Sequence, residues 1–365
     1  MSLPLLRYTS NLYPAADFSN TAIIACQHLL GTTLDLFKEL FAKGLRPESV
    51  FLLGKCYSTH SGTLKKFQKL GVHVSPLSIA FDAGRSYDDQ FEDYVANLVD
   101  EAASALELKN FARILILDDG GFVIRRVNES FKDVANVVGI EQTSSGHEKL
   151  KTIELRFPVI NVARSKAKLE IESPLIAKRV IEKLSEKMGF SMDTRVLVIG
   201  QGSVGKEIKQ QLQGRCTVNG CDSQADRCDF QGNYSDQLPT FDVIIGATGQ
   251  LAVTVEECKK LKQGAVLVSA SSSDREFPAL ALRANTRSKK CHADSEIAGV
   301  RFLNGGFPIN FDGGLHSLPP NEAQLTRSLL LAGLCEAVIG DHAAGLSDLS
   351  EQQNMIVQEF TKYVR

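Results

Sequence analysis

The sequence of 365 residues has no tryptophan, only four methionines and no excess of either charge sign. It carries 41 Lys and Arg against 43 Asp and Glu, for a net charge of −2, with no long run of one sign. Nucleic acids and anionic membranes attract clustered positive charge. We therefore expect neither of them as a partner.

Long apolar runs and cysteine frameworks are also missing. No run reaches the length of about 18 apolar residues that spans a membrane, and the N-terminus lacks the pattern of a secretory signal. The eight cysteines show no CxxC and no disulfide spacing, so we expect thiols of a soluble, cytoplasmic protein. Cys291 and His292 are adjacent, but no further ligand lies at metal spacing, so no metal site is expected.

The chain is long enough for two domains, each burying its own core. Short apolar strands alternate with amphipathic helices, which is typical of α/β domains with parallel sheets. We expect strands at 22–25, 50–53, 114–117, 137–140, 159–162, 196–199, 243–245, 265–268 and 300–303. Expected helices include 62–70, 130–136, one that starts with Ser173 as its N-cap, and a long apolar one at 325–339 that returns to the first domain.

A glycine-rich turn follows the strand at 196–199. Its glycines, and the residues that open the next helix, are Gly200, Gly202, Ser203, Val204 and Gly205. In a GxGxxG turn the first glycine allows a tight bend, the second lets the main chain approach a pyrophosphate, and the third lets the helix pack on the strand. The alternative is an ordinary surface turn.

After the helix, Thr217 and Val218 lead to Asp222, which lies where a carboxylate can accept hydrogen bonds from both ribose hydroxyls of an adenosine. Because Asp222 would repel a 2′-phosphate, we predict NAD rather than NADP as the cofactor. Thr248 and Gly249 come directly after the strand at 243–245 and are expected at the edge of the cofactor.

Polar residues also follow strands in the first half of the chain. His28 and Asp119 come after the first and third expected strands, and Lys168 comes after the strand at 159–162. An alcohol that loses a hydride needs a general base for its proton, and a buried lysine with a lowered pKa can serve. Each residue also has a plain interpretation: a core histidine, a turn former and a solvated loop charge.

Several motifs occur in an order that resembles the S-adenosylhomocysteine hydrolase family. They are Cys-x-His after the first strand, Ile-Leu-Asp-Asp-Gly-Gly, Glu-x-Thr-Ser-Ser-Gly, Ile-Asn-Val with a lysine seven residues after the Asn, and Val-x-Gly-x-Gly-x-Val-Gly-Lys. The resemblance implies two doubly wound α/β domains, with a Rossmann NAD-binding domain at 173–311 inserted into a substrate domain formed by 1–172 and 312–345. Residues 346–365 would be a C-terminal tail, and the family suggests a homo-oligomer in one-carbon metabolism.

The chemistry implied by the resemblance is oxidation of a ribose 3′-hydroxyl by bound NAD, elimination of the 5′ thioether, addition of water and return of the hydride. The implied catalytic residues are His28, Asp119 and Lys168, with Glu172 where the family has an aspartate. Glu172 could instead pair with Lys168 and keep its amine protonated. The implied cofactor contacts, besides the glycine turn and Asp222, are Thr143, Ser144, Ser145 and Asn304.

The sequence departs from the family where the substrate would be held. Family residues that grip the nucleoside, or that act as acid and base in the elimination, are replaced by Leu30, Thr32, Gln142, Ser272 and Phe311, with His316 near the last position. Two classes of function stay open. One is an NAD-dependent enzyme, hydrolase or net dehydrogenase, acting on a small nucleoside-like molecule; the other is a non-catalytic NAD-binding sensor or scaffold.

Overall fold

The chain forms two compact units in this computed structural model, which describes residues 3–132, 134–165, 167–230, 234–284, 290–297 and 299–364. Unit 1 comprises Met1–Ala80, Phe91–Glu172 and Gly314–Arg365, and unit 2 comprises Phe81–Gln90 and Ser173–Gly313. The expected substrate domain of 1–172 and 312–345 includes Phe81–Gln90, which belongs to unit 2, and the second division lies at 313/314 where 311/312 was expected.

Unit 1 is built on a seven-stranded sheet whose neighbouring strands all pair in parallel. Its strands are β1 (Thr21–Cys26), β2 (Val50–Leu53), β3 (His73–Val74), β4 (Arg113–Asp118), β5 (Val137–Glu141), β6 (Pro158–Asn161) and β13 (Gly345–Asp348). The order is β13-β6-β5-β4-β1-β2-β3, so the chain moves outward from β1 to one side and then returns to its other side. In doubly wound sheets such a reversal is where ligands bind, at the carboxyl ends of the two strands that flank it.

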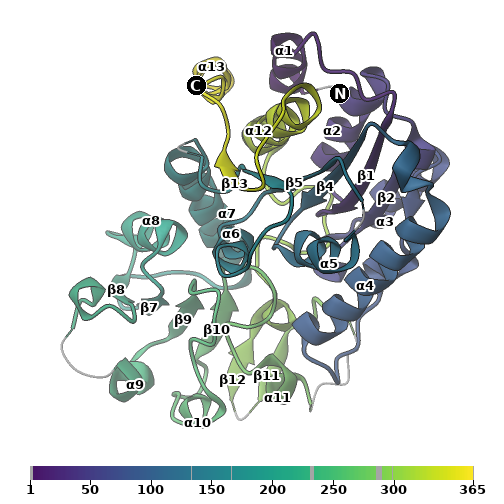
Figure 1. The fold of residues 1–365 in the computed structure, drawn as a ribbon. Coiled ribbons are helices and arrows are strands. Elements are labelled where there is room, and N and C mark those ends of the chain that lie inside the picture. Colours follow the sequence, from purple (N-terminus) through teal and green to yellow (C-terminus); the bar gives the residue numbers. More distant parts are fainter. Residues whose placement is uncertain are drawn as a thin grey trace. The chain divides into compact units, whose positions relative to one another are not determined.

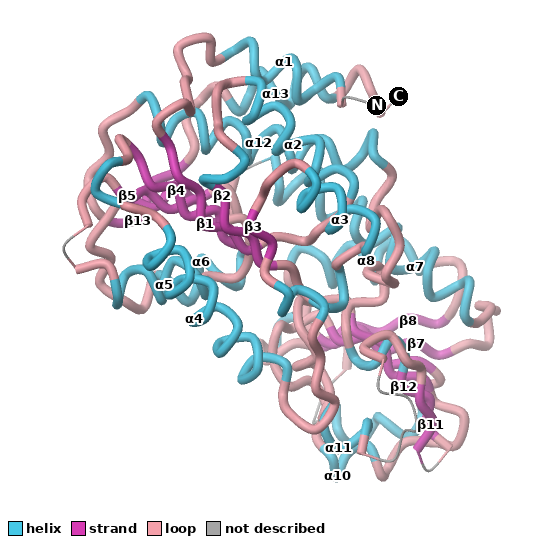
Figure 2. The backbone as a smooth tube through the Cα atoms, turned by 90° about the vertical axis from the view of Figure 1, so that its right-hand side faces the viewer, coloured by secondary structure: helices cyan, strands magenta, loops and turns pink. Residues whose placement is uncertain are grey.

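Helices cover both faces of this sheet. They are α1 (Pro4–Leu12), α2 (Gly31–Ala42), α3 (Ser61–Lys69), α4 (Tyr87–Ala105), α5 (Phe122–Ser130), α6 (Ser144–Leu150), α12 (Pro320–Ile339) and α13 (Gln353–Phe360). Figure 2 shows α2 and α12 on one face and α5 and α6 on the other. Every strand residue from Ala22 to Cys26 is buried, as expected for a central strand of a parallel sheet.

Three local expectations were wrong. The helix expected at 130–136 is α5 (Phe122–Ser130), because it starts directly after Gly121, whose φ is +75°, with the Asp118 carboxylate accepting from the Ile124 N–H at 2.9 Å. Ser173 is not an N-cap, since a π-helical turn at Lys168–Glu172 already precedes it. Residues 346–365 are not a separate tail: β13 extends the sheet beside β6, and α13 packs on α12.

Unit 2 contains a six-stranded sheet of the order β11-β12-β10-β9-β7-β8, visible in Figure 1. Its strands are β7 (Arg195–Ile199), β8 (Thr217–Cys221), β9 (Val243–Gly246), β10 (Val266–Ser269), β11 (Ser295–Ile297) and β12 (Val300–Phe302). Only β11 pairs antiparallel among the described strands. Its helices are α7 (Ser173–Lys187), α8 (Ser203–Leu212), α9 (Tyr234–Gln237), α10 (Val255–Cys258) and α11 (Ala279–Arg283). The chain reverses between β7 and β9, which is the arrangement of a Rossmann fold.

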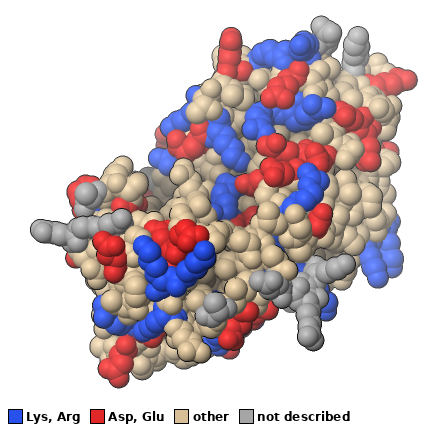
Figure 3. All heavy atoms as spheres, turned by 90° about the horizontal axis from the view of Figure 1, so that it is seen from below, with Lys and Arg blue, Asp and Glu red and all other residues tan. Residues whose placement is uncertain are grey.

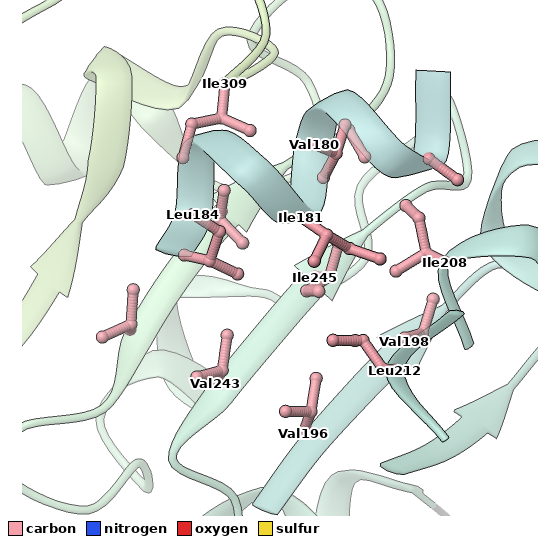
Figure 4. Close-up of a cluster of buried hydrophobic side chains, with 14 of the residues drawn as sticks. Val180, Ile181, Leu184, Val196, Val198, Ile208, Leu212, Val243, Ile245 and Ile309 are labelled. Carbon is pink, nitrogen blue, oxygen red and sulfur yellow. The ribbon is translucent and has the colours of Figure 1, made fainter. Parts of the chain in front are cut away.

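Alternate residues of β7 pack into two cores. Val196 and Val198 lie with the inward faces of α7 and α8, where Ile181 and Ile208 meet (Figure 4), while Leu197 belongs to the cluster on the opposite face. Strand residues point alternately to the two faces of a sheet, so one run of apolar residues supplies both layers. The strand that leads into the glycine turn is therefore held from both sides.

The surface carries mixed charge. On the face drawn in Figure 3, Lys and Arg side chains are interspersed with Asp and Glu side chains. Within the described residues, no helix has the length and apolar character needed to cross a membrane.

Candidate active site and nucleotide site

The glycine turn of unit 2 has the geometry that a dinucleotide site requires. Gly200 has a φ of +97°, and a Cβ on it would lie 2.6 Å from the Ala247 main chain. A Cβ on Gly205 would lie 1.8 Å from the Gly200 carbonyl oxygen, so only glycine lets α8 start so close to β7. A Cβ on Gly202 would meet no described atom within 4 Å. The main chain at Gly202 is therefore open to a phosphate, beside exposed Ser203 and half-buried Val204 at the start of α8.

Asp222 lies at the carboxyl end of β8 and is tied to the same turn. Its carboxylate accepts from the Gln201 N–H at 2.6 Å and from the Gln224 N–H at 3.2 Å. Burial alone would raise the pKa of Asp222, but these hydrogen bonds hold it below its ordinary value. A charged carboxylate thus stands next to the phosphate-binding turn, as a ribose acceptor would.

The turn after β9 is held by a carboxylate that the sequence did not single out. Glu276 is fully buried and accepts from the Gly249 N–H at 2.5 Å, from the Thr248 hydroxyl at 2.8 Å and from the Ser271 hydroxyl. Burial raises its pKa. Thr248 and Gly249 thus lie at the carboxyl edge of the sheet, with their polar groups directed to Glu276.

Asn304 stabilises the turn in which it lies through hydrogen bonds of its side chain and main chain. It has a φ of +53°, its side-chain amide donates to the carbonyls of Phe307, Pro308 and Phe311, and its N–H donates to Asp294. Asparagine tolerates this left-handed conformation better than most residues. These bonds give Asn304 a sufficient structural role, whether or not it also contacts a cofactor.

A cavity of about 460 Å³ lies beside α8. Its basic lining residues are Lys206, Lys209 and Arg227, of which Lys209 pairs with Asp229 at 2.5 Å. Arg227 is also close enough to Asp222 to favour its ionised form. The sequence analysis did not single out Arg227, because it does not directly follow Asp222 in the sequence.

In unit 1, His28 and Asp119 meet at the reversal between β1 and β4, as the strand pattern predicted. His28 Nε2 lies 3.3 Å from Asp119 Oδ2, and His28 Nδ1 lies 2.5 Å from the Ser58 hydroxyl oxygen. The Lys55 ammonium lies 2.5 Å from Asp119 Oδ1 and 2.7 Å from the Asp119 carbonyl oxygen. His28, Lys55, Ser58 and Asp119 are all buried, with exposed fractions between 1% and 7%.

The groups of this cluster shift one another's pKa values. Burial alone would raise the pKa of Asp119, but Lys55 and His28 hold it well below its ordinary value. Burial lowers the pKa of His28, and Asp119 offsets this only in part. We therefore assign a neutral imidazole that donates from Nε2 to the carboxylate and accepts at Nδ1 from Ser58. Ser58 is 1% exposed, so it serves to orient the ring rather than to attack a substrate.

Lys168 and Glu172 face each other on the π-helical turn. Lys168 Nζ lies 3.1 Å from Glu172 Oε2 and 2.7 Å from the Gln142 carbonyl oxygen. Glu172 in turn accepts from the Thr326 hydroxyl of α12. The interpretation of Lys168 as a solvated loop charge does not fit these contacts, since its side chain is only 12% exposed.

The Thr-Ser-Ser turn is organised by Glu141 at the end of β5. Glu141 accepts from the N–H groups of Gly120 and Gly121 and from both the N–H and the hydroxyl of Thr143. Burial and the nearby Asp118 carboxylate raise its pKa. Thr143 also caps α6 by accepting from the Gly146 N–H, whereas Ser144 is exposed and Ser145 is half-buried.

Four functional candidates in unit 1 were missed from the sequence. Lys55 and Ser58 lie after β2, at the same sheet edge as His28, and the strand-end rule could have found them. Gln27 and Arg327 needed the fold, because α12 brings Arg327 across 295 residues to Thr32. Within the described residues, no group of three His, Cys, Asp or Glu side chains is placed to hold a metal ion.

Comparisons with known proteins give distant relationships. No family model matches the sequence. Uncharacterized proteins of two Mycobacterium tuberculosis strains are 38% identical to the chain over 347 residues, which span 92% of this chain and 66% of theirs, just under two thirds. An adenosylhomocysteinase of Sulfurisphaera tokodaii is 24% identical over 200 residues, 50% of this chain and 48% of that protein. The resemblance found in the motifs thus holds as a distant similarity over half of the chain.

Two solved structures are similar only in outline. A dipicolinate synthase chain from Bacillus halodurans aligns over 89% of this chain and 99% of its own, with 12% identity and a TM-score of 0.43. NAD⁺-bound 3-phosphoglycerate dehydrogenase of Entamoeba histolytica aligns over 87% and 93%, with 12% identity and a TM-score of 0.40. Similarity at this level does not bear on function.

Proposed function

We propose that unit 2 binds NAD and that the protein uses it to oxidise a secondary hydroxyl of a nucleoside-like substrate held by unit 1. The observation that carries the proposal is the glycine turn between β7 and α8, with the Asp222 carboxylate bonded to its Gln201 N–H at 2.6 Å. The open main chain at Gly202 fits a pyrophosphate, and Asp222 fits a ribose. Bound NAD supplies a hydride acceptor, a chemistry that no protein side chain provides.

The residues of unit 1 supply the proton chemistry that this reaction needs. Asp119, kept ionised by Lys55, holds the imidazole of His28 in one tautomer. The amine of Lys168 is the proposed base for the substrate hydroxyl. Glu172 Oε2, which lies 3.1 Å from Lys168 Nζ, positions this amine, and the amine takes the substrate proton in its deprotonated form.

The substrate departs from that of the resembled family in this proposal. Thr32 and Gln142 replace side chains with which that family holds or transforms its nucleoside, so hydrolysis of S-adenosylhomocysteine is not the activity we propose. The buried Lys55–Asp119 pair, with the partly buried Lys168–Glu172 pair at the same sheet edge, favours a catalytic role over a mere scaffold, because burying charged groups is costly unless they have a function.

The test is a single-turnover screen of the full chain with NAD, in which a panel of nucleosides and nucleotides is added and NADH is followed by absorbance. Reduction of NAD by one class of compounds supports the enzyme. NAD binding without reduction by any compound favours the alternative of a sensor or scaffold, and absence of NAD binding removes both.

A further inference from the structure

Arg327 is a buried cation that forms no ion pair within the described residues. It lies in α12 within the run Ala323–Ala337, in which every residue is buried, and it is the only basic residue of that run. Its exposed fraction is 5%. Burying a guanidinium costs several kcal/mol in ordinary proteins unless a carboxylate compensates it. A partner is therefore to be expected.

The partners that Arg327 has are neutral. Its Nε donates to the Thr32 hydroxyl at 3.3 Å and its Nη1 donates to Gln27 Oε1 at 3.2 Å. Within the described part of the chain, no carboxylate forms an ion pair with Arg327, and its Nη2 makes no hydrogen bond. Three of the five N–H bonds of a guanidinium are thus left over.

Two other cations that are buried in the described part of the chain are paired, Lys55 with Asp119 and Arg283 with Asp274. Partly buried Lys168 pairs with Glu172. The carboxylates that act on Arg327 at longer range are Asp119 and Glu172, which are already engaged in these pairs. Burial accordingly lowers the pKa of Arg327 despite their influence.

A second unpaired donor lies beside it. Gln27 is fully buried, and its Nε2 has no hydrogen-bond partner among the described residues, while its Oε1 holds Arg327. A buried donor without an acceptor costs roughly 1–3 kcal/mol. Gln27 immediately precedes His28, so the free donors of Gln27 and Arg327 gather at the same strand end as the candidate catalytic histidine.

We infer that Arg327 and Gln27 form a subsite for an oxyanion of the substrate, a carboxylate or a phosphate ester. An oxyanion supplies both the missing charge and the missing acceptors, and a guanidinium matches its two oxygens side by side. Thr32, which stands where the resembled family carries a nucleoside-gripping glutamate, here accepts from Arg327. A carboxylate of that family is thus replaced by a neutral hydroxyl that contacts a cation. The inference rests on the proposed function in that it places the substrate of that reaction beside His28.

The experiment measures thermal unfolding of the full chain with increasing sodium malonate or inorganic phosphate, at constant ionic strength set with sodium chloride. Arg327→Met removes the cation and keeps an unbranched apolar side chain. Arg113→Met removes a cation of unit 1 that pairs with exposed Asp341, and it serves as the matched control. We expect a saturable rise in Tm for the wild type and for Arg113→Met, and none for Arg327→Met.

A rise with malonate alone identifies a carboxylate, and a rise with phosphate alone identifies a phosphate ester. Without a ligand, Arg327→Met is expected to unfold at the same or a higher temperature than the wild type, because it removes an uncompensated charge. If this variant fails to fold, Arg327→Lys tests the same point: its point charge lacks the planar donor pair, so anion affinity is expected to fall at least about tenfold.

No saturable rise with either anion in the wild type would overturn the inference, and so would an equal rise in Arg327→Met. These results test the anion subsite independently of the proposed oxidation, because the anion titration needs neither NAD nor turnover. Calorimetric NAD binding to Arg327→Met, expected to be unchanged, completes the separation.

Discussion

The Lys55 ammonium donates to both the side chain and the main-chain carbonyl of Asp119, at 2.5 and 2.7 Å. This double contact fixes the turn after β4 and keeps the carboxylate ionised against the cost of burial. The remaining oxygen of Asp119 faces His28. One ion pair thereby sets the orientation of the imidazole, which is the property that a catalytic histidine needs.

Replacement of Lys55 by Met is predicted to lower the free energy of unfolding by about 3–5 kcal/mol, because it leaves a buried carboxylate without its cation. Urea unfolding measures the loss. Lys38→Met is the control: Lys38 pairs with Asp35 at 3.1 Å but is 54% exposed, so a change within about 1 kcal/mol is expected. Similar losses in the two variants would contradict the role assigned to Lys55.

His28 is predicted to make stability depend on pH. Burial lowers its pKa in the folded protein below the ordinary 6.5, so the unfolded chain takes up its proton first as the pH falls. The stabilisation is fully present above pH 6.5 and is lost as the pH falls through the folded pKa. His28→Asn cannot titrate, so its destabilisation relative to the wild type is expected to be smaller at pH 5 than at pH 7.5. Chemical unfolding at both values checks this, and a larger effect at pH 5 would show a raised pKa instead.

The sheet edges were predictable because two rules act together. Apolar runs define the strands, and polar residues after them gather at one edge, which is why His28 and Asp119 could be paired in advance. Lys55 also follows a strand, but the sequence did not single it out, since a lysine after a strand is most often solvated. The position of Arg327 could not be predicted in this way, because a residue in an apolar helix gives no local sign of which strand end it reaches.

Helix starts were less predictable for a related reason. Gly120 and Gly121 have the composition of a loop, yet their N–H groups are taken up by Glu141 and α5 begins at the next residue. The acceptor comes from a different strand, so only the folded sheet shows where these donors are satisfied.

NAD is predicted to bind more tightly than NADP, because the Asp222 carboxylate would repel a 2′-phosphate. Calorimetric titration with both cofactors measures the preference. Asp222→Asn is expected to reduce the ratio of NAD affinity to NADP affinity by at least about tenfold, or ~1.4 kcal/mol. A wild-type preference for NADP would instead assign Arg227 as the residue that meets the ribose.

The same titration applied to Gly202→Val tests the other half of this cofactor site. Binding of NAD should be abolished while unit 1 stays folded, since the side chain would occupy the space into which a pyrophosphate fits. Gly189→Val is the matched control, because a Cβ there also meets no described atom within 4 Å and Gly189 lies outside the turn. Retained binding in Gly202→Val would remove the glycine turn from the cofactor site.

Hydrolysis of S-adenosylhomocysteine is predicted to be absent or far slower than about 1 per second, a usual lower scale for enzymes. Neither Thr32, which accepts from Arg327, nor Gln142 offers a carboxylate where the resembled family holds and transforms its nucleoside. A thiol-release assay decides the matter. Turnover at or above that rate would show that other groups recognise the nucleoside.

Lys168→Met is predicted to slow single-turnover reduction of NAD by at least about 100-fold, the usual scale for loss of a general base. Methionine keeps most of the volume and removes the amine that now bonds Glu172 and the Gln142 carbonyl. Arg164→Met, which removes an exposed cation of the same loop, is the control and is expected to act within a few-fold of the wild type. NAD affinity should be unchanged in both variants, because neither residue belongs to unit 2.

The companion variant Glu172→Gln separates two roles of the ion pair. If Glu172 mainly stabilises the ammonium of Lys168, Glu172→Gln reduces NAD at least as fast as the wild type at neutral pH, because an amide is a weaker partner for the cation. A slower rate of Glu172→Gln at every pH assigns Glu172 to positioning the amine. Reduction that persists in Lys168→Met within a few-fold of the wild type would move the base to His28 or His316.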